Sequence, residues 1–305
     1  MNSVRTTGQN LLLAVVGRRL LQRIGRFLYM LGRGEQGGDM LINGEHYVQS
    51  CVVAACASPG PVTVFDVGGN VGDWSELLIK AFPNNDLSAL RLFVFEPTPA
   101  TREGLAIRLA PYRDGSITIS PIALSEASGP ARFAVMSESS GTNSLAYDAM
   151  SLTDALDMLD VETLTLDDFC SSRGVERINL IKTDTEGHDF SILKGAKGML
   201  QAGRIDVYQF EYNHMWAYSH AFLRDVFLLI RETPYRLARM MPGHIELVDE
   251  WHPELDRFMA GNYLLLHPGA LEWLDARPGS FDASNTFASV SGRLDRPSRI
   301  VAAEG

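Results

Sequence analysis

Cysteine is scarce in this 305-residue sequence, which contains three cysteines and no CxxC pair. An odd number without such a pair argues against the disulfide framework of a small secreted protein and against a structural zinc site. A chain of this length buries enough surface to fold without either support. We therefore expect a protein of a reducing, cytoplasmic compartment.

The sequence also lacks an apolar run long enough to cross a bilayer, because arginines follow the short run at residues 11–16. A signal peptide would place its positive charges before the apolar stretch. Helical spacing instead predicts an amphipathic helix within residues 10–33, with arginines opposite its apolar stripe. That stripe consists of Leu20, Ile24, Phe27 and Leu31. Such a helix either packs on the domain or makes a peripheral contact with an anionic membrane.

Acidic residues are absent from the first 34 positions, which contain six arginines. The whole chain carries a net charge of −10, so residues 35–305 carry −16. Binding to a phosphate backbone needs a basic face, and we therefore expect no nucleic-acid partner. The acidic body does not exclude a small ligand that is held by local backbone dipoles.

The central part of the chain alternates short β-branched runs with helical segments. The expected strands are residues 62–67, 90–95, 116–122, 178–183, 205–210, 235–240 and 262–267. This alternation predicts an α/β fold with a mostly parallel sheet and helices on both faces. We expect a basic helix and linker at 1–44, one domain at 45–275 and a largely unstructured tail at 276–305. Residues 137–160 show no clear period and are expected to form loop and short helix.

A glycine-rich loop follows the first expected strand in the sequence VTVFDVGGNVGDWS. Its residues Asp66, Gly68, Asn70 and Gly72 fit neither the dinucleotide pattern nor the P-loop pattern. An acid before the first glycine would repel a pyrophosphate but can accept hydrogen bonds from an ammonium group. The loop therefore suits a ligand with an amino-acid part, and the alternative is an ordinary turn capped by Asp73.

A second acid, Glu96, ends the next strand in LFVFEPTPA. The carboxyl ends of parallel strands meet at one edge of a sheet, so Glu96 is expected beside the glycine-rich loop. A carboxylate in this place can accept hydrogen bonds from ribose hydroxyls. The alternative is a solvated carboxylate at a strand end.

These segments resemble the FkbM-type S-adenosylmethionine-dependent methyltransferases. The matching blocks are FDVGGNVGDWS (65–75), FVFEPTP (93–99), SPIALSEASG (120–129), ETLTLDDF (162–169), LIKTDTEGHDFSILKGA (180–196) and VYQFEYN (207–213). The resemblance spans residues 62–213, and the block at 180–196 is the most specific. It implies a Rossmann-like class I methyltransferase fold, with a seven-stranded, mostly parallel sheet and an antiparallel last strand.

The resemblance also implies S-adenosyl-L-methionine as the cofactor. It assigns Asp66, Gly68, Asn70 and Gly72 to the methionine end and Glu96 to the ribose. It places Ala123, Leu124 and Ser125 at the edge of the adenine. Acids at two strand ends match a cofactor that is neutral to cationic overall.

Candidate catalytic groups lie in KTDTEGHD and QFEYNH. Asp184 follows an apolar run and should reach the cleft, and His188 has an ordinary pKa suited to a base. Glu211 is expected to face Asp184 across neighbouring strand ends, as a proton-sharing pair or, as a minority interpretation, a divalent-metal site. Lys182 is expected to pair with one of these acids. The residues after the fifth strand either line a sugar or ring pocket or pack in the core: Tyr212, His214 and Trp216. The polar segment 139–144 is expected near the acceptor.

The sequence thus predicts a methyltransferase that acts on a hydroxyl of a sugar, glycan, glycolipid or natural product, without a required metal. A non-catalytic cofactor-binding protein of the same fold is an open alternative. An NAD-dependent or nucleotide-sugar oxidoreductase is disfavoured, because the glycine pattern fails and no tyrosine has a lysine four positions later.

Overall fold

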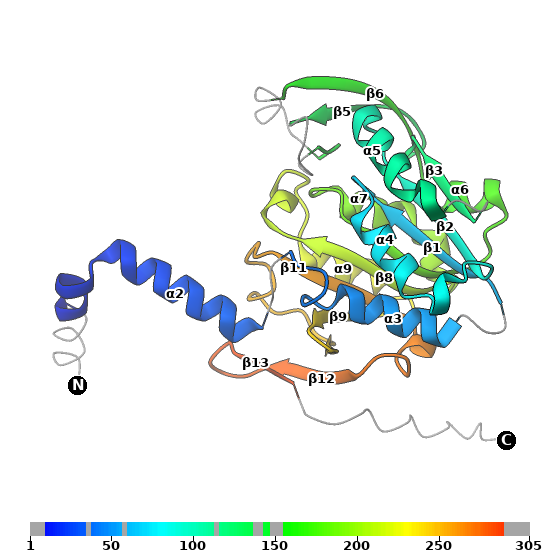
Figure 1. Ribbon diagram of the computed structural model, residues 1–305. Coiled ribbons are helices and arrows are strands. Elements are labelled where there is room, and N and C mark those ends of the chain that lie inside the picture. The colour runs from blue at the N-terminus through cyan, green and yellow to red at the C-terminus, as the bar shows by residue number, and fades with distance from the viewer. Residues whose placement is uncertain are drawn as a thin grey trace, which may run out of the picture.

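The computed structural model describes residues 10–34, 38–56, 60–112, 116–136, 143–146 and 155–289. The helices are α2 (Arg18–Arg33), α3 (Glu45–Cys56), α4 (Asp73–Lys80), α5 (Pro99–Leu109), α6 (Leu166–Arg173), α7 (Asp189–Gly195), α8 (Lys197–Gln201) and α9 (Leu223–Ile230). A helical segment at residues 10–16 precedes α2. Most helices surround a central sheet, whereas α2 projects away from it (Figure 1).

The central sheet has ten strands. In spatial order they are β13 (Phe287–Ser289), β12 (Ala276–Phe281), β10 (His244–Val248), β9 (Arg236–Met241), β11 (Gly261–Leu266), β8 (Ile205–Tyr212), β7 (Ile178–Thr183), β1 (Val62–Val67), β2 (Leu90–Phe95) and β3 (Ile117–Ser120). A smaller sheet consists of β4 (Ala123–Leu124), β6 (Asp157–Leu164) and β5 (Gly129–Val135). This second sheet lies beside the end of the large one (Figure 1).

Seven neighbouring strands, from β3 to β9, have the arrangement expected of the class I fold. Strands β3, β2, β1, β7 and β8 are parallel neighbours, and β11 is antiparallel to both β8 and β9. The expected α/β fold with a mostly parallel sheet and an antiparallel last strand is thereby confirmed. The expected number of strands is wrong, because β10, β12 and β13 extend the sheet beyond β9.

Two local expectations also need correction. Residues 276–281 and 287–289, expected in an unstructured tail, form β12 and β13, while residues 290–305 lie outside the described part. The sequence ARPGSF of β12 contains proline and glycine, which are depleted in strands, so local propensity does not indicate a strand here, although β12 pairs with β10 on one side and with β13 on the other. Residues 157–160, expected in a loop, begin β6, which pairs with β5.

Side chains alternate along the parallel strands and pack into two hydrophobic cores, one on each face of the sheet. On β1, Val62 and Val64 pack with α3, α4 and α5, whereas Phe65 and Val67 pack with α6 to α9. Phe169 of α6 meets Phe65 and Phe95 with ring centroids 5.6 and 4.8 Å apart. Aromatic pairs of this kind add about 0.5–1.5 kcal/mol beyond the area that they bury. The two cores hold the strand ends in fixed relative positions.

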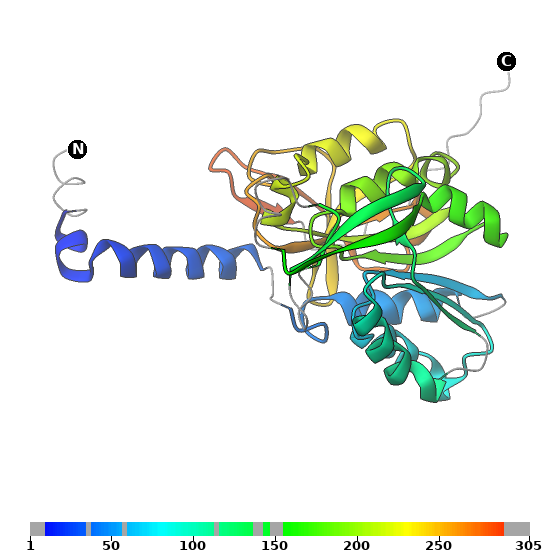
Figure 2. The ribbon, with the colours of Figure 1, turned by 90° about the horizontal axis from the view of Figure 1, so that it is seen from above.

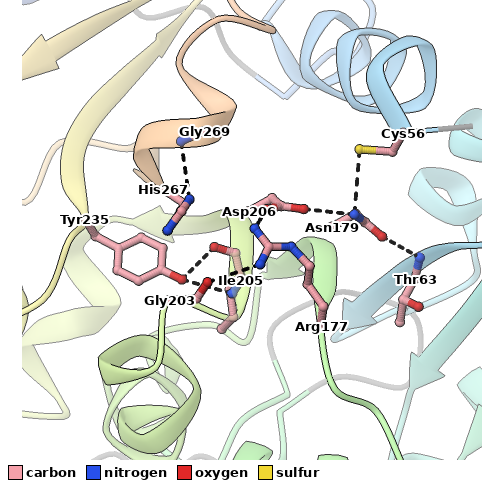
Figure 3. A network of polar contacts seen from close by, with 10 residues as sticks. All are labelled: Cys56, Thr63, Arg177, Asn179, Gly203, Ile205, Asp206, Tyr235, His267 and Gly269. Carbon is pink, nitrogen blue, oxygen red and sulfur yellow. Dashed lines mark hydrogen bonds and ion pairs between the residues drawn. The ribbon is translucent and has the colours of Figure 1, made fainter. Parts of the chain in front are cut away.

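A polar network ties together the sheet edge opposite the glycine-rich loop (Figure 3). Asp206 of β8 accepts a hydrogen bond from Asn179 of β7 at 2.8 Å and pairs with Arg177. Asn179 in turn accepts from the backbone N–H of Thr63 in β1 at 2.9 Å. The hydroxyl of Tyr235 accepts a hydrogen bond from the backbone N–H of Ile205 and donates one to the carbonyl oxygen of the same residue. These bonds satisfy polar groups at the starts of three parallel strands, far from the loop that ends β1.

Helix α2 does not pack its apolar stripe on the domain. None of its residues is buried, and it extends away from the body in both views (Figures 1 and 2). Only its carboxyl end is held: Tyr29 donates to Glu254 at 2.9 Å, and Arg239 donates to the carbonyl of Arg33 at 2.7 Å, in the part of the chain described here. The interpretation of α2 as a core-packing helix is therefore wrong.

Candidate functional site

A pocket of about 230 Å³ lies at the carboxyl ends of β1, β2 and β7. Its wall combines segments that directly follow these strands with residues of the smaller sheet and of the segment after α2. The lining residues used below are Met40, Gly68, Gly69, Asn70, Trp74, Glu96, Ala123, Leu124, Phe133, Asn143, Lys182, Asp184, Thr185, Glu186 and His188. Ligands of open α/β sheets bind at this edge, so this pocket is the candidate site.

The glycine-rich loop forms one side of the pocket and tolerates no larger residue at its start. Gly68 has a φ of 78°, and a Cβ atom there would lie 2.1 Å from the carbonyl oxygen of Asp184. At Gly69 a Cβ atom would lie 2.3 Å from a methyl group of Val94. The backbone N–H groups of both glycines donate to the carbonyl of Phe95 at 3.0 Å. The loop backbone is thus held tightly between β2 and β7 and forms part of the pocket wall.

Asp66 lies behind the loop and does not line the pocket. It is fully buried, accepts a hydrogen bond from Ser75 at 2.6 Å, and lies 3.5 Å from the Nζ of Lys182. Burial raises the pKa of Asp66, although Lys182 opposes this shift. The structure therefore places Asp66 beneath the loop, where it contacts Ser75 of α4 and Lys182. Its expected interaction with an ammonium group of the ligand, directly or through water, stays a prediction. Gly72 also lies outside the pocket wall.

Lys182 connects the loop with the opposite side of the pocket. Its Nζ lies 3.4 Å from a carboxylate oxygen of Asp184 and donates to the carbonyl of Gly68 at 3.4 Å. Burial alone would lower the pKa of Lys182, but Asp184, Asp66 and Glu45 together raise it above its ordinary value. The lysine is therefore a fixed buried cation, which agrees with the pairing expected from the sequence.

Glu96 lines the pocket at the end of β2 and is nearly buried. One carboxylate oxygen accepts from the backbone N–H of Asn70 at 3.1 Å, and the other accepts from Thr98 at 2.9 Å. Burial raises the pKa of Glu96, and hydrogen bonds from the backbone and the side chain of Thr98 and from the backbone of Asn70 lower it. Each oxygen has a further acceptor site, so the side chain can bind two neighbouring hydroxyl groups.

The third expected segment contributes two of its three residues to the pocket. Ala123 and Leu124 of β4 line the wall, together with Phe133 of β5. Ser125 lies outside the wall but its hydroxyl is 3.0 Å from the Nε2 of His188. The segment thus forms an apolar side suited to a flat ring and also positions the histidine.

The candidate catalytic residues are only partly brought together. Asp184 and His188 line the pocket, whereas Glu211 does not. Burial lowers the pKa of His188 to about 4, so its imidazole is neutral at pH 7. The Asp184 side chain is 41% exposed and thus reaches toward solvent from the pocket wall.

Glu211 is half-buried, lies outside the pocket wall and has several other acids nearby. Burial, followed by the charges of Asp184, Asp189 and Glu186, raises the pKa of Glu211 to about 9. A carboxyl group with this pKa is protonated at pH 7 and is unsuited to be a base there. Among the described residues, no group of three or more acids, histidines or cysteines has metal-binding geometry.

Replacing Glu211 with glutamine is expected to make stability less dependent on pH. The folded pKa of about 9 lies above the ordinary 4.5, so between these values the folded state holds a proton that the unfolded state has lost. Stability contributed by this group therefore falls as pH rises. We expect Glu211→Gln to gain at least about 1 kcal/mol relative to wild type between pH 5 and pH 8, measured by urea unfolding.

The exposed Glu232→Gln variant is the matched control, and its difference from wild type should not change with pH. A difference between Glu211→Gln and wild type that stays constant from pH 5 to pH 8 would contradict a raised pKa at Glu211.

The pocket also contains residues that the sequence did not single out. Met40 comes from a turn after α2 and Trp74 comes from α4, and neither gave a separate signal for a ligand in the sequence. Within the polar segment 139–144, Asn143 lines the pocket and Ser144 donates to the carbonyl of Thr185 at 2.8 Å, while residues 139–142 lie outside the described part. Tyr212 and Trp216 are fully buried in the core, so the interpretation of these residues as packing is confirmed.

The strand order and the pocket at the ends of β1, β2 and β7 together define a class I methyltransferase fold. The sequence from residue 66 to residue 237, more than half of the chain, matches the Methyltransferase FkbM domain. The protein belongs to this family of S-adenosylmethionine-dependent methyltransferases, and it is therefore a methyltransferase.

Several solved structures are similar to this chain at low sequence identity and low TM-score. The precorrin-6y C5,15-methyltransferase of Geobacter metallireducens is 12% identical, with 75% of this chain and 91% of that chain covered and a TM-score of 0.33. A Streptococcus mutans protein in complex with SAH is 8% identical. The match covers 72% of this chain and 94% of that protein, with a TM-score of 0.40. The bifunctional kinase-methyltransferase WbdD is 12% identical. The match covers 78% of this chain and 42% of WbdD, with a TM-score of 0.41.

These identities and scores are too low to transfer the role of any residue. The chain spans less than half of the length of WbdD. No curated protein matches this sequence significantly.

Proposed function

We propose that the pocket binds S-adenosyl-L-methionine and that the enzyme transfers its methyl group to a hydroxyl oxygen of a sugar, glycan, glycolipid or natural product. The observation that carries this proposal is the carboxylate of Glu96, nearly buried and adjoining the glycine-rich loop on one pocket wall. When bound, the cofactor supplies a methyl group on a sulfonium centre.

The residues of the pocket fit such a cofactor in three regions. Glu96 can accept hydrogen bonds from two ribose hydroxyls, and Ala123 and Leu124 present an apolar side to an adenine ring. The loop at Gly68 and Asn70 exposes backbone to an amino-acid end. Trp74 supports the fit independently, because its buried Nε1–H has no hydrogen-bond partner among the described residues. A polar ligand atom in the pocket would satisfy this donor.

Asp184 is proposed as the group that takes the proton from the acceptor hydroxyl. It lines the pocket, is partly exposed, and is held by the buried cation of Lys182. His188 is neutral at pH 7 and is the second candidate, positioned by Ser125. Glu211 is left out of the proton transfer because it is protonated at neutral pH and lies outside the pocket.

The proposed acceptor is a hydroxyl compound because the side of the pocket around Asp184 is polar. Asn143, Thr185 and Glu186 lie there and can bind several hydroxyl groups. A proton acceptor beside these groups suits the methylation of oxygen, in which the hydroxyl must lose its proton. No metal is part of the proposal, since the described acids offer no metal-binding group.

Substitution of Glu96 tests the cofactor site directly. We expect wild type to bind S-adenosylhomocysteine in a calorimetric titration, and Glu96→Gln to bind it about tenfold more weakly or worse, because a hydrogen bond to a charged group contributes about 1.5–3 kcal/mol. The glutamine conserves the shape of the side chain, and its single oxygen can still accept one of the two backbone hydrogen bonds.

Glu103→Gln on the exposed side of α5 is the matched control and should bind like wild type. Equal affinity of wild type and Glu96→Gln would contradict the ribose contact. Absence of binding by folded wild type would contradict the cofactor site itself.

A further inference from the structure

The amino-terminal helical region exposes a large apolar surface that the described domain does not cover. In α2, the exposed fractions of Phe27, Leu31 and Leu28 are 65%, 60% and 57%. The preceding helical segment exposes Leu11 and Val15 by 65% and 76%. Single exposed apolar residues are ordinary, but a continuous set on one segment marks an interaction surface.

The apolar residues of α2 form one narrow face. At 100° per residue, its six large aliphatic and phenylalanine side chains fall within an arc of about 120°. They are Leu20, Leu21, Ile24, Phe27, Leu28 and Leu31. The flanks and the opposite side of the helix carry its five arginines and Gln22, together with Tyr29 and Met30, so no charged side chain interrupts the apolar face.

The amino-terminal end of α2 lacks the usual sources of helix stability, whereas its carboxyl end has the left-handed cap Gly34 and Arg33 in the last turn. The N-cap residue Gly17 makes no side-chain hydrogen bond, and no acid lies in the first turn. Most helices in proteins depend on the packing of an amphipathic face, because isolated helices of about 12–15 residues are marginal in water. An external surface that covers the apolar face would supply the missing stabilisation.

We propose that α2 and the helical segment before it dock on the surface of an anionic lipid bilayer. Arginines flank the apolar face, and residues 1–34 contain no acid. Apolar side chains would enter the boundary between headgroups and acyl chains, while guanidinium groups meet lipid phosphates. The rest of the chain, with a net charge of −16, is repelled by the same surface, so the attraction is confined to this region.

A second copy of this chain is a poorer occupant. A pair of α2 helices packed through their apolar faces would gather ten arginines around one short helix pair, with no acid on either helix to offset the repulsion. On the described parts of the domain, exposed apolar side chains such as Ile107, Leu156 and Leu228 come from different segments. The part of the chain described here also contains no helix long and apolar enough to span the bilayer.

Docking of α2 would place the pocket close to the bilayer surface. The short segment after α2 exposes Leu41 and Ile42 by 64% and 54%, and the adjacent Met40 lines the pocket. The contacts of Tyr29 and Arg33 with Glu254 hold this end of α2 against the domain. The surface that binds lipid therefore continues to the rim of the pocket. The docking of α2 does not depend on the proposed cofactor.

Co-sedimentation of the full chain with vesicles tests the proposal. Wild type should bind vesicles of phosphatidylcholine that contain about 30% phosphatidylglycerol, because this share of anionic lipid makes the surface strongly negative. It should bind pure phosphatidylcholine much less, and binding to the anionic vesicles should weaken at high salt. The double variant Phe27→Ser/Leu31→Ser should bind the anionic vesicles at least about tenfold more weakly.

The matched control is Ile107→Ser/Leu228→Ser, which removes two equally exposed apolar side chains from α5 and α9. It should bind like wild type, and circular dichroism should show that both variants fold. Failure of wild type to bind anionic vesicles, or equal losses in the two variants, would overturn the proposal. Sedimentation velocity provides a second readout: a dimer that depends on Phe27 and Leu31, without vesicle binding, would also overturn it.

The two proposals can fail separately. Titration with S-adenosylhomocysteine reports the pocket, and neither double variant is expected to change that affinity. Vesicle binding without cofactor binding would contradict the proposed function and leave the docking surface intact.

Discussion

Lys182→Met is expected to lower the free energy of unfolding by about 3–5 kcal/mol, the usual cost of removing one partner from a buried ion pair. The Nζ of Lys182 lies 3.5 Å from Asp66 and 3.4 Å from Asp184, and it also donates to the Gly68 carbonyl. Methionine keeps most of the volume but leaves Asp66 fully buried without its cation. Urea unfolding at pH 7 measures the loss.

A second substitution separates charge from packing. In Lys182→Met/Asp66→Asn the unpaired carboxylate is gone, so the double variant should be more stable than Lys182→Met alone. Lys197→Met on the exposed side of α8 is the control and should lie within about 0.5 kcal/mol of wild type. A loss below about 1 kcal/mol in Lys182→Met would mean that the buried pair contributes little to holding the pocket.

Asp184→Asn is expected to lower kcat for methyl transfer by about 10²–10⁴-fold, the usual contribution of a positioned general base. Asparagine has nearly the same shape but cannot take a proton from a hydroxyl. Transfer of a tritium-labelled methyl group from S-adenosylmethionine to the first glycoside or glycolipid that wild type labels provides the rate. Affinity for S-adenosylhomocysteine should change far less than kcat, because the proposed proton transfer concerns the acceptor.

Asp160→Asn, on the exposed side of β6, is the control for this substitution and should retain the wild-type rate. If kcat of Asp184→Asn stays within about threefold of the wild-type value and kcat of His188→Gln falls further, His188 is the base and the proposed role of Asp184 is wrong.

The central fold could be predicted from the sequence because its signals are local. Strands such as 62–67 and 90–95 are short β-branched or apolar runs, and each is followed by a helical segment. Their parallel pairing brings Gly68 and Glu96 to the same edge, and in the structure both residues line the pocket. The resemblance to a family then indicated the order of the strands.

The remaining features depend on contacts between distant segments. Strand β12 exists because it pairs with β10, and its own sequence contains proline and glycine. The position of Asp66 beneath the loop depends on Lys182, which comes from another strand more than a hundred residues later. The raised pKa of Glu211 results from burial and several neighbouring acids. No single segment carries the information for these features.

The most direct test of the account is a crystal structure of the full chain with S-adenosylhomocysteine. We predict the ligand in the pocket at the ends of β1, β2 and β7, with both ribose hydroxyls on Glu96. Its amino-acid end should lie against the loop at Gly68 and its adenine beside Ala123 and Leu124. A ligand bound elsewhere, or ribose hydroxyls that make no contact with Glu96, would contradict the account.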